Sequence, residues 1–227
     1  MIALRNLAFY VAFYSGSAVL VPFAGLMGTI HAPWARGPIQ AWSNWHRWCV
    51  TRLLGIAVRT EGVNPAIPAL YAIKHESFFE AIDAPVLLDR PVPFAKAELF
   101  RIPGWAAASS AWGAVAVERE QGAKMLRQMV GQARSYAAEG RQLVIFPEGT
   151  RVPHGGPAPL QAGFAGLYKM LGLPVVPVAV DSGPLYHRRW KRPGTITYRF
   201  GEIIAPGLPR EEMERRVGEA LNALNPG

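Results

Sequence analysis

His75 and Glu80, five positions apart, are the residues of this chain whose types and spacing best suit proton transfer. The apolar run 69–73 predicts a strand, which delivers His75 to the point where a helix is expected to begin. Ser77 and Glu80 have the spacing of a capping box, in which the glutamate folds back toward the start of the helix. The Glu80 carboxylate is therefore expected beside the imidazole, where it would orient the ring and stabilise the imidazolium. The pattern predicts that His75 is a general base.

Two simpler alternatives stay open for these residues. The pattern of Ser77 and Glu80 is also found where its only role is to begin a helix. That role is compatible with Glu80 holding the His75 imidazole. Asp83, about one turn further along the predicted helix, is a second candidate partner for His75.

Several common catalytic motifs are missing from the sequence. No two glycines are spaced as G-x-G, no lysine follows a glycine, and no serine has a glycine two positions before it. These gaps exclude the dinucleotide fingerprint, the phosphate loop of nucleotide hydrolases and the nucleophile elbow of esterases. Phe79 stands where a zinc-protease helix beginning at His75 needs its second histidine. A base-driven transfer without a covalent intermediate remains.

A second group of candidate residues follows the apolar run 143–146 and reads Pro147-Glu148-Gly149-Thr150-Arg151. Such a turn offers exposed amides, the Thr150 hydroxyl and a guanidinium, and Gly149 permits close approach of the backbone. Arg151 can hold a phosphate by two parallel hydrogen bonds, and Lys96 would add a second positive charge. Glu148 is expected to fix the loop or a substrate hydroxyl rather than act as the base. The alternative for Arg151 is an ordinary surface salt bridge.

In these residues the chain resembles the glycerol-phosphate acyltransferase family, and within it the branch that acts on 1-acyl-sn-glycerol-3-phosphate. The first family motif is a histidine followed five positions later by an acidic residue, usually aspartate; here the longer Glu80 takes that place. The other matches are Phe94-Ala95-Lys96-Ala97-Glu98-Leu99, the segment 147–151, Val176-Pro177-Val178-Ala179 and, more weakly, Glu118-Arg119. The four main matches occur in family order and lie between residues 70 and 180.

The resemblance implies the reaction and the role of each residue. His75 and Glu80 would be catalytic, and the substrate-binding residues would be Lys96, Arg119, Glu148, Gly149, Thr150 and Arg151. An acyl-CoA or acyl carrier protein thioester would acylate lysophosphatidic acid, giving phosphatidic acid in phospholipid biosynthesis. No cofactor and no metal are expected, because a thiolate leaves readily. Lyso-ornithine lipid or glycerol-3-phosphate as the acceptor stays open, as does a catalytically silent membrane adaptor.

The first part of the chain is typical of a membrane anchor. No charged residue occurs from Leu7 to Ile30, and a helix of that length reaches about 36 Å, enough to cross a hydrocarbon core of about 30 Å. Pro22 interrupts this segment, so the helix is expected either to span the bilayer or to re-enter it. Trp34, Trp42, Trp45 and Trp48 follow, and indole rings prefer the headgroup level.

We therefore expect two anchoring helices at 3–30 and 38–56, the second lying in the membrane interface, within an anchoring region 1–58. The alternative is that the second helix packs its tryptophans into the protein core. The expected location is the cytoplasmic face of a bacterial inner membrane or an equivalent membrane.

Residues 59–227 alternate between strand and helix patterns, which predicts an α/β catalytic domain with a mixed, largely parallel sheet covered by helices. Strands are expected at 69–74, 92–95, 114–117, 142–146, 174–180 and 195–200, and helices at 77–88, 120–139, 160–171 and 209–224.

The net charge of +8 favours an anionic partner, whereas the scattered basic residues match no nucleic-acid-binding motif. The single cysteine, Cys49, excludes an internal disulfide.

Overall fold

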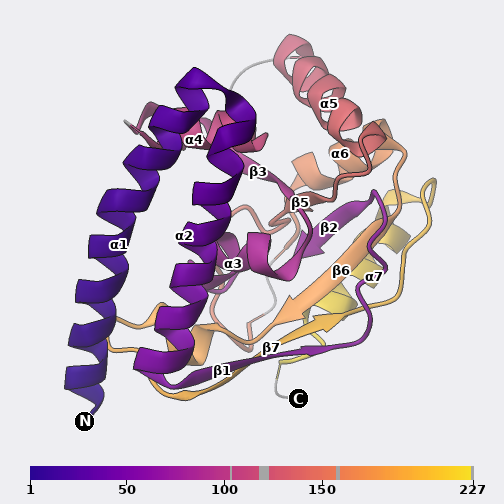
Figure 1. Cartoon of the computed structure of the whole chain (residues 1–227). Helices are drawn as coiled ribbons and strands as arrows, with labels where there is room; N and C mark the ends of the chain where they lie inside the picture. The colour runs from indigo at the N-terminus through magenta and orange to yellow at the C-terminus, as the bar shows by residue number, and fades with distance from the viewer. Residues whose placement is uncertain (103, 118–122, 157–158, 226–227) are drawn as a thin grey trace.

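One sheet of seven strands organises the computed structural model, which describes residues 1–102, 104–117, 123–156 and 159–225 (Figure 1). The strands are β1 (Ile56–Glu61), β2 (Leu70–Ile73), β3 (Val92–Lys96), β4 (Val115–Val117), β5 (Leu143–Ile145), β6 (Val175–Val180) and β7 (Gly194–Phe200). They lie in the order β1-β7-β6-β2-β5-β3-β4. Neighbouring strands are parallel except for the antiparallel pair β6 and β7. The prediction of a mixed, largely parallel sheet is confirmed.

The helices that surround this sheet are α1 (Ile2–Ile30), α2 (Arg36–Trp48), α3 (Phe79–Leu87), α4 (Trp105–Trp112), α5 (Ala123–Ala138), α6 (Ala162–Leu171) and α7 (Arg210–Leu221). The helix predicted at 38–56 is α2 followed by a π-helical turn, Cys49–Leu54. Two elements were not predicted. β1 is an edge strand with charged residues at its end, and α4 is rich in alanine and serine without an amphipathic period.

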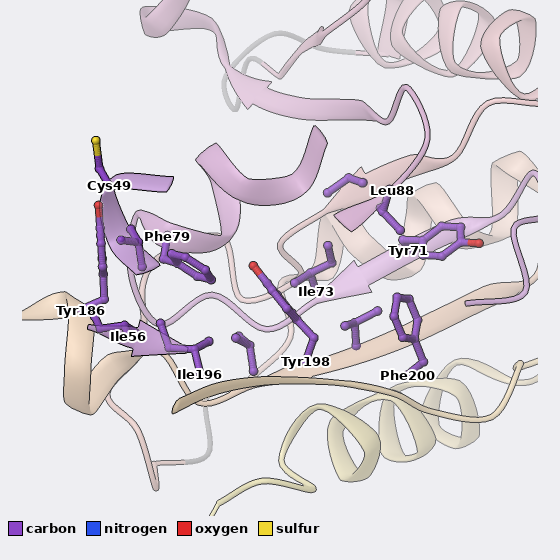
Figure 2. Close-up of a cluster of buried hydrophobic side chains, with 14 of the residues drawn as sticks. Cys49, Ile56, Tyr71, Ile73, Phe79, Leu88, Tyr186, Ile196, Tyr198 and Phe200 are labelled. Carbon is purple, nitrogen blue, oxygen red and sulfur yellow. The ribbon is translucent and has the colours of Figure 1, made fainter. Parts of the chain in front are cut away.

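Alternate residues of the central strand β2 enter two separate cores, one on each face of the sheet. Tyr71 and Ile73 pack with residues of α1 and α3 and of the π-helical turn, a cluster that Figure 2 shows in part. Leu70 and Ala72 pack with residues of α5, α6 and α7. All four side chains are fully buried. Since successive side chains of a strand point to opposite faces, a continuously apolar strand must be covered on both sides, as β2 is here.

Three glycines of α1 are points of close approach to other helices. A Cβ added at Gly25 would lie 2.6 Å from the carbonyl oxygen of Gly104, and one at Gly28 would lie 2.9 Å from the Cβ of Ala111. Gly16 lies directly under the indole of Trp45. These glycines lower the intrinsic stability of an isolated helix, but they let α1 pack closely on α2 and α4.

The outer side of α1 stays apolar and exposed, including Leu7, Val11 and Phe23. α1 runs through Pro22 as one helix, and its length and composition suffice to cross a membrane. The tryptophans between residues 34 and 48 fall into two groups. Trp42 and Trp45 pack against the core, and their indole N–H groups donate to residues of α1, whereas Trp34 and Trp48 are exposed. The boundary near residue 58 and the interfacial position of α2 remain predictions.

A buried ion pair joins α2 to α3. The Arg47 Nε donates to Asp83 Oδ1 at 2.6 Å, and a second guanidinium nitrogen donates to the other carboxylate oxygen. The Tyr198 hydroxyl donates to the same carboxylate at 3.1 Å, and the Asp83 side chain is fully buried. A carboxylate removed from water needs such partners to remain ionised, so the pair fixes the N-terminal helices to the helix that carries Glu80.

We predict that Arg47→Met destabilises the protein by about 3 kcal/mol, because it leaves the buried Asp83 charge without its cation. Arg210→Met is the matched control. Arg210 pairs with Glu214 on the surface of α7, its side chain is 61% exposed, and such a pair contributes less than about 1 kcal/mol. Denaturant unfolding followed by circular dichroism measures both changes. Equal losses in the two variants would contradict the role assigned to the buried pair.

Candidate active site

The candidate residues gather at one edge of the sheet, where parallel strands end. β2 pairs in parallel with β5 and with β6, and β5 pairs in parallel with β3. His75 follows β2, Glu148 follows β5, Ser182 follows β6, and Lys96 ends β3. Because the carboxyl ends of parallel strands meet at the same edge of a sheet, residues far apart in sequence are brought together there.

His75 and Glu80 lie within hydrogen-bond distance, as the sequence predicts. The His75 Nδ1 is 3.3 Å from Glu80 Oε2. The imidazole stacks on the Phe146 ring at a centroid distance of 4.2 Å, and the His75 carbonyl accepts the Val152 amide at 2.7 Å. The side chain of His75 is 15% exposed, so the ring is fixed on one side and accessible on the other. With the Nδ1 proton donated to Glu80, Nε2 is the nitrogen that can accept a proton.

Serine hydroxyls and a backbone amide hold the Glu80 carboxylate, which is fully buried. Glu80 accepts the Ser77 amide at 3.1 Å, as a capping box requires, while the Ser77 hydroxyl accepts the Phe79 amide at 3.0 Å. The hydroxyls of Ser77 and Ser182 both donate to Glu80. Sequence reasoning missed Ser182, since its contact depends on β6 lying beside β2. Asp83, the alternative partner of His75, is instead held by Arg47 and Tyr198.

Arg151 lies beside the start of α3. Its guanidinium carbon is 4.1 Å from the centroid of the Phe78 ring, and both side chains are exposed. No salt bridge to Arg151 occurs among the described residues, so the surface-pair alternative is not seen there. Thr150 is also exposed. Gly149 has a φ of 66°, a backbone conformation that favours glycine, and its amide donates to the Phe146 carbonyl. The loop thus presents an exposed guanidinium and hydroxyl.

The structure describes one of the two remaining basic candidates, Lys96, and not the other, Arg119. Lys96 is exposed at the end of β3, on the same edge of the sheet as His75. Arg119, and Glu118 before it, lie outside the described residues. A pocket shared by Lys96 and Arg151 remains a prediction.

Glu148 is a buried carboxyl with an unsatisfied oxygen. Its side chain is 5% exposed, and within the described part of the chain Oε2 has no hydrogen-bond partner. Burial raises the pKa of Glu148 to about 7, although the backbone amides of Glu148 and His75 oppose this rise. Glu148 therefore changes its charge near neutral pH, next to the backbone of the candidate base.

An apolar hollow lies between the N-terminal helices, α3 and α4. Its walls include Leu20 and Ala24 of α1, Trp42 of α2, Ala84 of α3, and Trp105 and Ala108 of α4. Ala81, the residue after Glu80, also lines it. A hollow of this lining suits a hydrocarbon chain and offers little to a charged group.

The Acyltransferase family model matches residues 55–181, which include every site residue predicted from the sequence. The chain is 30% identical over 190 residues to the 1-acyl-sn-glycerol-3-phosphate acyltransferase of Pseudomonas aeruginosa, an alignment that covers 81% of this chain and 72% of that protein. It is 28% identical over 167 residues to the 1-acyl-sn-glycerol-3-phosphate acyltransferase alpha of Mus musculus, covering 70% of this chain and 57% of the mouse protein.

The fold is similar to that of a solved structure, the 1-acyl-sn-glycerophosphate (LPA) acyltransferase PlsC of Thermotoga maritima. The TM-score is 0.75 at 21% sequence identity, and the match covers 98% of this chain and 95% of the other. At this identity the likeness concerns the fold. It includes the N-terminal helices, since nearly the whole chain is matched.

We predict that Glu148→Gln stabilises the protein at about pH 8 by about 3 kcal/mol and has much less effect at about pH 5. The pKa of this carboxyl is raised from 4.5 in the unfolded chain to about 7 in the folded protein. The folded state therefore holds the proton more tightly than the unfolded chain. Stability is lost as the pH rises from 4.5 to about 7. Thermal unfolding of the variant and the wild type at both pH values measures the difference. An equal effect at both pH values would contradict the prediction.

Proposed function

This chain belongs to the Acyltransferase family, and we propose that it transfers a fatty acyl group from a thioester to the free hydroxyl of 1-acyl-sn-glycerol-3-phosphate. The product would be phosphatidic acid, an intermediate of phospholipid biosynthesis. The observation that carries the proposal is the His75 imidazole, held by a buried carboxylate and partly exposed at the sheet edge. The names of the relatives from Pseudomonas aeruginosa and Mus musculus support the same acceptor.

His75 acts as the general base in the proposed reaction. Its Nε2 accepts the proton of the acceptor hydroxyl while that oxygen attacks the carbonyl carbon of the thioester. The tetrahedral intermediate then collapses, the carbon–sulfur bond breaks, and the thiolate takes the proton from the imidazolium. Glu80 holds the Nδ1 proton and stabilises the imidazolium between the two steps. Base catalysis of this kind contributes about 100-fold to 10,000-fold.

Arg151 binds the phosphate of the acceptor in this proposal. Its exposed guanidinium lies on the Phe78 ring at the start of the helix that carries Glu80. The ring contact limits the freedom of the long side chain, so less entropy is lost when a phosphate binds. Lys96 and Arg119 are proposed as further phosphate contacts, and Glu148, Gly149 and Thr150 as the loop that shapes this end of the site.

The apolar hollow between the helices receives an acyl chain in the proposed complex. Ala81 of its wall follows Glu80 directly in α3, so one helix carries both a wall of the hollow and the partner of the candidate base. Burying a hydrocarbon chain there stabilises the complex by about 0.8 kcal/mol per methylene.

Membrane association brings the protein to its lipid acceptor and lets the lipid product return to the bilayer. The exposed apolar side of α1 suits the bilayer, and the net charge of +8 favours an anionic membrane surface on the cytoplasmic side. The thioester donor, acyl-CoA or acyl carrier protein, approaches from that side, and no cofactor or metal is needed. The choice between the two donors is tested by supplying each of them in the assays below.

We predict that His75→Ala lowers the turnover number at least about 100-fold, because no other group takes the proton. Membranes containing the variant, given labelled acyl thioester and 1-acyl-sn-glycerol-3-phosphate, report the rate of phosphatidic acid formation. His187→Ala is the matched control, since His187 is exposed outside the site. Undiminished turnover in the His75 variant would refute the proposed mechanism.

Arg151→Ala is predicted to raise the KM for the acceptor about 10-fold to 100-fold, the effect of losing one charge-assisted contact of about 1.5–3 kcal/mol. The turnover number and the KM for the thioester should change much less. Arg210→Ala, on the exposed surface of α7, serves as the control. An unchanged acceptor KM would show that the phosphate does not bind to Arg151.

Ala108→Phe is predicted to shift the preference toward shorter acyl chains, since the added ring fills part of the hollow between α1 and α4. Competition between thioesters of different chain length, with product analysis by mass spectrometry, measures the shift. Ala220→Phe, a substitution on α7 away from the hollow, is the control. An identical chain-length profile in both variants would show that the acyl group does not lie in the hollow.

A further inference from the structure

The residues on either side of His75 are charged and fully buried. Lys74 and Glu76 have side-chain exposures of 1% and 0%, whereas His75 is partly exposed. Successive side chains of an extended segment point to opposite sides. Lys74 and Glu76 therefore lie together on the side away from the imidazole, and the Lys74 Nζ is 3.6 Å from Glu76 Oε1.

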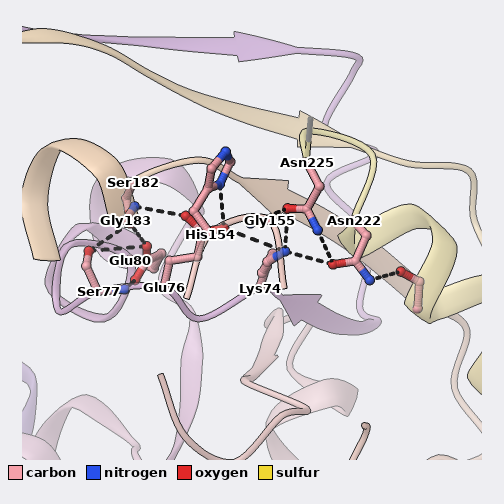
Figure 3. A network of polar contacts seen from close by, with 11 residues as sticks. Lys74, Glu76, Ser77, Glu80, His154, Gly155, Ser182, Gly183, Asn222 and Asn225 are labelled. Atoms are coloured by element: carbon pink, nitrogen blue, oxygen red, sulfur yellow. Dashed lines mark hydrogen bonds and ion pairs between the residues drawn. The ribbon is translucent and has the colours of Figure 1, made fainter. Parts of the chain in front are cut away.

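Both charged groups of this pair have hydrogen-bond partners (Figure 3). The Lys74 ammonium donates to Asn222 Oδ1 at 2.7 Å and to Asn225 Oδ1 at 2.8 Å, and its third position faces Glu76. Glu76 Oε2 accepts the Gly183 amide at 2.8 Å, and Oε1 lies 3.0 Å from His154 Nδ1. Two desolvated charges thus form a satisfied network, which is the condition under which they are tolerated inside a protein.

The network connects four segments that meet at the sheet edge. Lys74 and Glu76 belong to the segment after β2, His154 to the loop that follows Arg151, Gly183 to the turn after β6, and Asn225 to the chain after α7. Asn225 Oδ1 also accepts the Gly155 amide at 3.4 Å, which ties the Arg151 loop to the same point. The turn after β6 is bound twice, because Ser182 donates to Glu80 while Gly183 donates to Glu76.

A stabilising role alone is a weak explanation for this arrangement. Replacing a buried ion pair by apolar residues of similar size is often neutral for stability, so such a pair contributes more to geometry than to free energy. The network fixes the position of His75, because it holds the residues immediately before and after it in the chain. A displacement of about 1 Å in a catalytic group lowers a rate by about 100-fold.

We propose that Glu76 is a positioning residue, which together with Lys74 and Asn225 fixes His75 between the loops after β5 and β6. The proposal rests on the acyltransferase function assigned to His75. It predicts that Glu76 acts mainly on the turnover number, because Glu76 is fully buried and touches no substrate, and affects acceptor binding only weakly through the loop of His154.

Glu76→Gln tests this directly, because glutamine keeps the size of the side chain but removes the charge that holds Lys74 and His154. We expect a turnover number about 100-fold lower, an unchanged KM for the thioester, and a change in the acceptor KM much smaller than that of Arg151→Ala. Glu61→Gln is the matched control: Glu61 pairs with Arg59 and Arg199, but it lies on the edge strand β1, and this variant should keep wild-type kinetics.

A second pair of variants keeps the test decisive if Glu76→Gln does not fold. Asn225→Leu removes the oxygen shared by Lys74 and Gly155 and should lower the turnover number, whereas Asn225→Asp retains an acceptor oxygen and should restore most of it. Thermal unfolding shows whether each variant is folded. A wild-type turnover number in folded Glu76→Gln or Asn225→Leu overturns the positioning role, as does a change confined to KM. An inactive wild type, by contrast, refutes the acyltransferase function itself.

Discussion

The parallel pairing of β2 with both β5 and β6 is the constraint from which the candidate active site follows. It places the ends of three strands side by side, so that His75, Glu148 and Ser182 meet although they are separated by more than a hundred positions from first to last. β2 is covered on both faces, and each of its residues is buried. The backbone of a base that directly follows such a strand is held rigidly by it.

The carboxyl groups at this edge differ in their hydrogen bonding. Glu80 and Glu76 are fully buried and receive donors on both oxygens, although burial still raises the pKa of Glu76 above its ordinary value. Glu148 is nearly as buried but leaves one oxygen without a partner among the described residues, and burial raises its pKa to about 7. An unsatisfied group of this kind costs stability.

The parts that sequence reasoning predicted are those set by local geometry. Five positions separate His75 from Glu80, and the capping-box spacing alone brings them together. The contacts of Ser182 to Glu80 and of Gly183 to Glu76 span more than a hundred positions and depend on strand order, which hydrophobic periodicity does not encode. β1 and α4 were missed for a related reason: neither has a clear apolar period, and both form because of what they pack against.

The N-terminal helices belong to the site as well as to the proposed anchor. α1 and α2 supply walls of the apolar hollow, and the same hollow is closed by α3, whose first turn carries Glu80. The Arg47–Asp83 pair fixes α2 to α3, so a movement of the anchor relative to the sheet would displace the hollow and the catalytic helix together. In the proposed function this coupling has a clear use. A lipid that enters from the bilayer along the exposed apolar side of α1 meets the apolar hollow, which would take an acyl chain, and its charged phosphate would bind at the exposed loop of Arg151.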